Sequence, residues 1–236
     1  MTAALSLIES LERERASVLR DPRRHAQLKR LQGWQVQRLL RTYADCAADA
    51  RYADALGFFV QDLYGPHDFG QRDRSLKKVL NQWERLLSRR GIESVICALE
   101  LEALTQSLDL AMIDVLGGAE PTEVTYAAAY RQANRRDDRQ RQIWLIVTSG
   151  RALDGLIKVP AIGVALRMAR LPARIAGVTQ LHEFLERGYT AFEKMGSAQD
   201  LLQIIEQRET AIMQRLFAGS VDPFQFAGKQ RAGRIS

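Results

Sequence analysis

Apolar residues recur along most of this 236-residue chain at the three- and four-residue spacing of amphipathic α-helices. Alternating apolar and polar positions, which would predict β-strands, are nearly absent. The helical pattern covers residues 5–19, 22–48, 49–64, 76–87, 92–116, 121–130, 139–158, 181–192 and 201–216, with a short helix and a bend in the 160s. We therefore predict an all-α fold, a single-domain multi-helix bundle of about nine helices.

Capping residues, prolines and glycines mark the ends of these segments. Asp21 and Pro22 suit the N-cap and the first position of a helix. A double glycine ends the segment of residues 92–116, so we predict a possible seam near residues 117–121. Residues 1–219 are assigned to the helical domain, and residues 220–236 to a poorly ordered basic C-terminal tail. The apolar stripe of the second helix carries Leu28, Leu31, Gln35, Arg38, Leu39 and Thr42.

Residues 58–73 predict a helix–turn–helix corner. The helix entering it starts at Asp49, and its buried face is predicted to hold Tyr52, Leu56, Phe59 and Leu63. Gly65 can adopt the left-handed conformation that closes a helix, and Pro66 cannot continue one. Asp68 can cap the helix that follows. The corner is expected to be structural, although an exposed Phe59 would make it a binding surface instead.

The same stretch carries a resemblance to a known family. The residues concerned are Phe58, Phe59, Leu63, Tyr64, Gly65, Pro66, Asp68, Phe69, Arg72 and Asp73. With residues 185–189 and 208–209, they resemble an uncharacterised bacterial family named for a Phe-Phe-Leu-Glu-Glu-Leu-Tyr (FFLEELY) motif. The chain departs from that motif at residues 60–62, where a neutral Gln61 argues against a role for two adjacent carboxylates. The resemblance implies a fold and no activity.

The composition is that of an ordinary soluble globular protein, with 46% hydrophobic and 26% charged residues. The formal net charge is +6, and an arginine-rich composition of this kind is more typical of a GC-rich genome than of a particular ligand. Cys46 and Cys97 stand apart among apolar neighbours, which predicts buried free thiols in a reducing compartment. With no signal peptide and no apolar run long enough to span a bilayer, the protein is predicted to be cytoplasmic and to lack a transmembrane segment.

Sequence motifs for catalysis or metal binding are absent. His25, His67 and His182 lack an acidic residue three positions earlier, which excludes the Glu-x-x-His pairs of di-iron bundles. Neither a nucleophile elbow nor a phosphate-binding loop occurs. We therefore name no catalytic residue, no metal ligand and no cofactor. Glu102 and Asp109 lie seven residues apart, and we interpret them as the solvated face of their helix.

One long segment, residues 155–182, contains no Asp or Glu. It carries four positive charges, on Lys158, Arg167, Arg170 and Arg174. Such a patch could bind an acidic protein, a phosphorylated ligand or an anionic membrane surface; alternatively, acidic side chains of other helices could neutralise it. Nucleic acid is disfavoured because no segment interleaves aromatic residues with arginines.

The leading hypothesis is a non-enzymatic protein that binds a macromolecular partner or an anionic ligand through this basic central region. The alternative is an enzyme or cofactor-binding protein with a polar site inside the bundle, formed by Tyr64, Glu186 and Glu209. A third hypothesis is a homo-oligomer with Trp34 or Trp83 in its interface.

Overall fold

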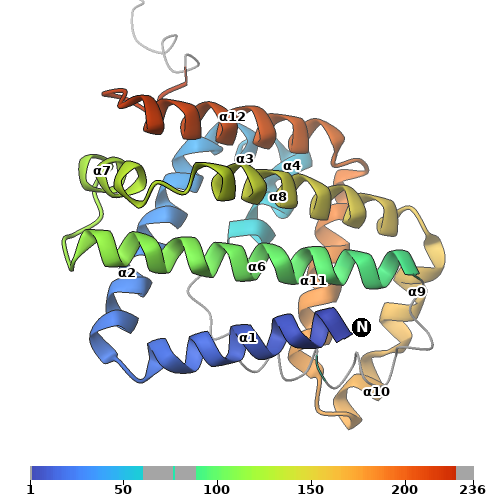
Figure 1. Ribbon diagram of the computed structural model, residues 1–236. Helices are drawn as coiled ribbons and strands as arrows, with labels where there is room; N and C mark the ends of the chain where they lie inside the picture. The colour runs from blue at the N-terminus through green and yellow to red at the C-terminus, as the bar shows by residue number, and fades with distance from the viewer. Residues whose placement is uncertain (1, 61–76, 78–88, 227–236) are drawn as a thin grey trace, which may run out of the picture.

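The computed structural model describes residues 2–60, 77 and 89–226 (Figure 1). This part of the chain contains eleven helices and no strand, and nine of the helices have at least seven residues. The prediction of an all-α, single-domain bundle is confirmed. The helices are α1 (Thr2–Leu19), α2 (Pro22–Thr42), α3 (Ala44–Ala47), α4 (Ala50–Phe58), α6 (Arg89–Leu116), α7 (Glu123–Ala133), α8 (Arg136–Ile157), α9 (Pro160–Met168), α10 (Arg170–Ile175), α11 (Thr179–Met195) and α12 (Gln199–Ala218).

Four long helices form one layer of the bundle. They lie side by side in the order α12, α8, α6 and α1 from top to bottom of Figure 1, and neighbours within the layer pack on each other. Behind the layer, α2 and α11 run across it at its two ends, with α3 and α4 between them. α2 packs on α6, and α4 packs on α11. The middle helices α6 and α8 are therefore enclosed by neighbours on several sides.

The predicted helix boundaries agree with the capping interactions. The Asp21 carboxylate accepts hydrogen bonds from the two backbone N–H groups that follow Pro22. Asp49 accepts one from the backbone N–H of Arg51, at 2.8 Å, and so caps α4. The two glycines after Leu116 have positive φ angles of 58° and 100°, which glycine adopts at little cost, and they end α6.

The corner is described only where α4 enters it. Tyr52 and Leu56 are buried as predicted, whereas Phe59 is half-buried and contacts other aromatic rings. Phe58 is the more deeply buried ring. Its packing requires a glycine on α11, because a Cβ at Gly188 would lie 2.8 Å from Cζ of Phe58. The remaining predictions for this region, on Leu63, Tyr64, Gly65, Pro66, His67, Asp68 and Trp83, lie outside the described residues.

The 160s region contains two short helices, α9 and α10, where one helix and a bend were expected. Pro172 is the third residue of α10, and the first turn of a helix tolerates proline because its N–H groups have no intrahelical acceptor. The joint at Ala169 keeps right-handed helical backbone angles, and its N–H bonds to the carbonyl of Ala165.

Apolar side chains gather in three core clusters. The first joins α4, α11 and α12 around Phe192, the second joins α2, α6, α7 and α12 around Met112, and the third packs α1 on α6 around Ile8. Cys46 is buried and Cys97 is half-buried, both as free thiols. Within the described ranges, no helix has the length and apolar composition needed to cross a bilayer.

The chain turns back on the bundle after Gly219, where α12 ends. Phe224 packs against Trp34 and Tyr126, with ring centroids 5.7 and 6.1 Å apart. Trp34 also stacks on Tyr126 at 4.3 Å, so its ring packs within a single copy of the chain. Residues 227–236 lie outside the described part, and the tail boundary therefore stays a prediction.

Candidate functional site

A cavity of about 90 Å³ lies inside the bundle, between the first and second core clusters. Side chains from α2, α6, α8 and α12 give it a polar wall, and its other wall is apolar. The polar lining side chains used below are Gln35, Arg38, Asp109, Arg139, Gln142 and Glu209. Leu39, Phe59, Ile146, Ile205 and Ile212 are among the apolar ones.

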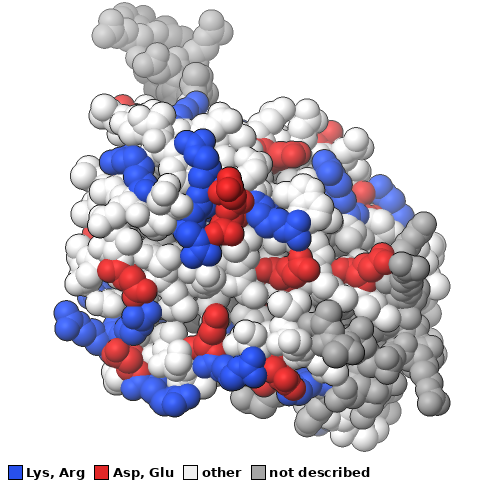
Figure 2. Space-filling model, viewed as in Figure 1, with Lys and Arg blue, Asp and Glu red and all other residues white. Residues whose placement is uncertain are grey.

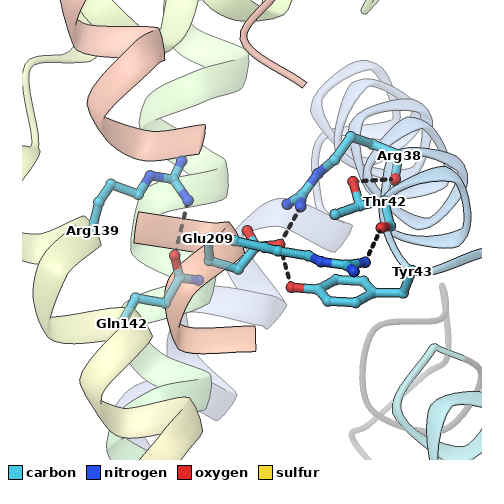
Figure 3. Close-up of polar contacts among 7 residues, drawn as sticks. Arg38, Thr42, Tyr43, Arg139, Gln142 and Glu209 are labelled. Atoms are coloured by element: carbon cyan, nitrogen blue, oxygen red, sulfur yellow. Dashed lines mark hydrogen bonds and ion pairs between the residues drawn. The ribbon is translucent and has the colours of Figure 1, made fainter. Parts of the chain in front are cut away.

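An ion pair between α2 and α12 forms one end of the polar wall (Figure 3). Nη1 of Arg38 donates to Oε1 of Glu209 at 2.5 Å, and the hydroxyl of Tyr43 donates to the same oxygen at 2.9 Å. Arg38 is only 9% exposed. Burial alone would lower the pKa of Arg38, but Glu209 raises it above its ordinary value. Burial and the charge of Glu209 together raise the pKa of Tyr43. At physiological pH Arg38 is therefore charged, and Tyr43 is a neutral hydrogen-bond donor.

Arg208, the neighbour of Glu209 on α12, joins α12 to the end of α2 and to Asp45 on α3. Its two Nη atoms bond both carboxylate oxygens of Asp45, at 2.7 and 2.6 Å. Nη1 also donates to the backbone carbonyl of Thr42 at 2.7 Å, which ties α12 to the end of α2. The hydrogen bonds from Arg208 lower the pKa of Asp45 to about 2.

A second group of polar side chains lies across from Arg38 (Figure 3). Nη1 of Arg139 donates to Oε1 of Gln142 at 3.1 Å, and Nε2 of Gln142 donates to Oγ1 of Thr105 at 2.8 Å. The Arg139 guanidinium lies over the ring of Tyr130, 4.6 Å from its centroid. The ring of Tyr130 and the amide of Gln142 therefore hold the Arg139 guanidinium at the cavity. Among the described residues, no carboxylate is hydrogen-bonded to Arg139.

Asp109 is the most deeply buried acid of the site, at 2% exposed. Nε2 of Gln35 donates to its Oδ1 at 2.9 Å. Burial raises the pKa of Asp109, while the hydrogen bond from Gln35 and the charge of Arg139 oppose that rise. Our interpretation of this acid as part of a solvated face is wrong, because α6 is covered by α1, α2, α7 and α8. Protonation of Asp109 would leave two guanidinium groups and one carboxylate at the cavity.

One donor of the site has no partner. Among the described buried side chains, Nε of Arg38 is the one nitrogen or oxygen atom without a hydrogen bond. Leaving a buried donor unsatisfied costs about 1–3 kcal/mol, and more for a charged group. Because Arg38 lines the cavity, an acceptor atom bound there could satisfy this N–H.

The donor set does not suit a metal ion. Across residues 2–60, 77 and 89–226, no three His, Cys, Asp or Glu side chains gather closely enough to coordinate one. The cavity pairs guanidinium and amide donors with aliphatic side chains, which suits a compact molecule with an anionic group and an apolar part. Its volume is smaller than the roughly 150 Å³ of an engineered cavity that binds benzene, so it limits the ligand to a few heavy atoms.

The site residues named from sequence are widely separated. Glu209 lines the cavity, whereas Glu186 is on the surface, where Nε and Nη2 of Arg170 bond it at 3.0 and 2.5 Å. Tyr64 lies outside the described residues. In the basic region, Lys158 pairs with Asp154 at 2.7 Å. Arg167 and Arg174 are exposed and form no ion pair with a described residue.

Sequence reasoning missed most of the polar wall. A signal was present in α2, where Leu31, Gln35, Arg38 and Thr42 follow one helical stripe and are all buried. Polar residues on a stripe that is otherwise apolar indicate an interior polar site. The signal for Arg139 and Gln142 was weaker, because they lie in the charged first half of α8.

The comparisons with known proteins place the chain in a family without assigning it an activity. Neither a curated protein nor a solved structure matches it. One family model matches residues 14–223, which is most of the chain. The protein therefore belongs to the family described as a domain of unknown function (DUF8198).

Proposed function

We propose that the protein binds a small organic anion, a short-chain monocarboxylate, in the cavity between α2, α6, α8 and α12. The observation that carries this proposal is the buried, unpartnered Nε–H of Arg38, a residue that lines a cavity with one polar wall, which contains two arginines, and one largely apolar wall. A carboxylate oxygen accepts from a guanidinium N–H in a charge-assisted hydrogen bond, which is stronger than a bond between neutral groups.

The remaining lining residues support the same class of ligand. Arg139 contributes a second positive charge, and Ile146 and Ile205 can contact a short alkyl chain. A negative ligand and an ionised Asp109 would repel each other, so binding favours the protonated form of that acid. We therefore expect the affinity for a carboxylate to rise as the pH falls toward the pKa of Asp109.

A pair of matched ligands tests the proposal. Propionate and propionamide have nearly the same shape and differ in charge, and isothermal titration calorimetry measures the affinity for each. We expect propionate to bind and propionamide to bind at least about tenfold more weakly, a loss that corresponds to one charge-assisted hydrogen bond. Equal affinities for the two, or no heat from propionate, would overturn the proposal.

Two variants locate the binding. Replacing Arg38 by Met and Glu209 by Leu together removes the donor without leaving an unpaired buried charge. This double variant should fold and lose propionate binding. Replacing Arg170 by Met, on the surface, should leave binding unchanged.

Three broader expectations remain proposals. For the basic central region of Lys158, Arg167, Arg170 and Arg174 we propose a separate role as an interaction surface, supported by the exposure of Arg167 and Arg174. We propose a cytoplasmic location, supported by the two free cysteines. We also propose that the family is the bacterial one named for the FFLEELY motif, supported by the residues between 58 and 73 that resemble that motif.

A further inference from the structure

The surface of α9 and α10 carries an unusual concentration of exposed apolar side chains. Five of the eleven large apolar side chains exposed in the described part of the chain fall within residues 159–175. Val164 and Met168 of α9 are 48% and 74% exposed, and Leu171 and Ile175 of α10 are 66% and 79% exposed. Isolated exposed apolar residues are ordinary, but a contiguous group marks an interaction surface.

These four side chains lie along one line. Their positions follow the i, i+4, i+7, i+11 spacing of a single helical face, and the helical backbone at Ala169 carries that face from α9 into α10. The opposite face is held on the bundle, since Ala173 is buried and Nε2 of His182 on α11 bonds the carbonyl of Leu166 at 2.7 Å. The apolar stripe Val164–Met168–Leu171–Ile175 therefore faces solvent, because the opposite face of the two helices packs on the bundle.

Positive charge accompanies the stripe on one side. Arg167 and Arg174 lie next to it on the helical projection, and both are exposed without an ion pair to any described residue. The segment from 155 to 182 itself contains no acid, and Glu186 of α11 pairs with Arg170 and also attracts Arg167. Elsewhere the surface is different: on the face formed by α12, α8, α6 and α1, basic and acidic side chains interleave, as in the pair Arg141–Glu100 (Figure 2).

We propose that α9 and α10 dock the protein on an anionic lipid surface. An amphipathic helix with aliphatic side chains on one face and arginines beside them lies in the plane of a membrane interface, its apolar face below the headgroups. The arginine stems can extend past the stripe so that their guanidinium groups reach lipid phosphates. In Figure 1, α9 and α10 lie at the lower right edge of the bundle.

The charge of the surface favours anionic lipid as its partner. Residues 158–175 contain four basic residues and no acidic residue, so this surface is complementary to anionic headgroups. The stripe has only four apolar side chains, so we expect membrane binding to be reversible. Because Arg167 and Arg174 contribute to it electrostatically, binding should require anionic lipid and weaken as the salt concentration rises.

Flotation of the full chain with lipid vesicles tests the proposal. One set of vesicles is pure phosphatidylcholine, and the other contains about one third phosphatidylglycerol, which gives the surface a negative potential. We expect the protein to float with the anionic vesicles only, and to detach when salt is raised to about 0.5 M, where charges are screened within a few ångströms.

Three double variants test which side chains contact the vesicle surface. Met168→Ser with Ile175→Ser should reduce vesicle binding by about tenfold or more, because it removes the two most exposed apolar side chains of the stripe. Arg167→Gln with Arg174→Gln should reduce binding to anionic vesicles and flatten its salt dependence. Leu19→Ser with Val124→Ser removes exposed apolar side chains from α1 and α7, and should change nothing.

The contrary results are equally specific. Absence of wild-type flotation, equal flotation with both kinds of vesicle, or full binding by the Met168→Ser, Ile175→Ser variant would overturn the proposal. If the wild-type chain fails to float and forms a dimer that this variant dissociates, the stripe contacts a second copy of the chain instead. Circular dichroism of each variant checks that the helices are intact.

Discussion

The Arg38–Glu209 pair should show a strong energetic coupling. Replacing Glu209 by Leu would leave the Arg38 guanidinium charged, 9% exposed and without a counter-ion, and would remove the acceptor of Tyr43. Breaking a buried ion pair by removing one partner costs about 3–5 kcal/mol. We expect a loss of that size from Glu209→Leu, and a similar loss from Arg38→Met.

The double variant should lose much less stability than either single variant. With both charges gone, the main remaining cost is the unsatisfied hydroxyl of Tyr43, about 1–3 kcal/mol, and the new apolar side chains offset part of it. The coupling free energy of the double-mutant cycle should therefore be at least about 3 kcal/mol.

Urea unfolding followed by circular dichroism measures all four free energies. The surface pair Arg170–Glu186 provides a control, since it is also a hydrogen-bonded Arg–Glu ion pair between two helices but its arginine side chain is 66% exposed. Its coupling should stay below about 1 kcal/mol. If the Arg38–Glu209 cycle gives a value as small as the control, the pair is solvated and our account of the site is wrong.

Two further predictions concern the interior of the bundle. Burial raises the pKa of Asp109 in the folded state, so ionisation of this acid destabilises the folded protein. The destabilisation is zero below the unfolded-state pKa and reaches its full size above the folded-state pKa. Asp109→Asn should therefore gain stability relative to the wild type as the pH rises from about 4 to about 7 in urea titrations, and a relative loss over that range would contradict this reasoning. Gly150→Ala should cost about 1–3 kcal/mol because the new Cβ would overlap the Leu202 Cδ2 methyl on α12. Gly155→Ala, on the open side of the same helix, should gain about 0.5–1 kcal/mol; a gain at both positions in thermal unfolding would show that α8 and α12 do not approach so closely.

Local sequence signals predicted the helices well. Asp21 and Asp49 cap α2 and α4 because the information for a cap lies within three or four residues. The double glycine after α6 acts in the same local way. The 160s region differed because a proline in the first turn does not prevent a helix, and the helix predicted over residues 22–48 is divided at Tyr43 into α2 and α3.

The site depends on contacts that no local pattern contains. Gln35 meets Asp109, 74 residues away, and Arg38 meets Glu209, 171 residues away. The spacing on α2 could show that Arg38 is buried, but not which helix supplies its carboxylate. Asp109 was misassigned for the same reason: its side of α6 faces Gln35 on α2 and not solvent, and that depends on tertiary packing.

The central claim is that the Arg38 guanidinium holds a carboxylate. The most direct measurement is a ¹⁵N–¹H spectrum of the arginine Nε–H groups, with the Arg38 signal assigned by its disappearance in the Arg38→Lys variant. Adding propionate should shift the Arg38 Nε–H signal progressively to a saturated position, while the same concentration of propionamide leaves it in place. An Arg38 signal that does not move with propionate, or that moves equally with both ligands, would contradict the account.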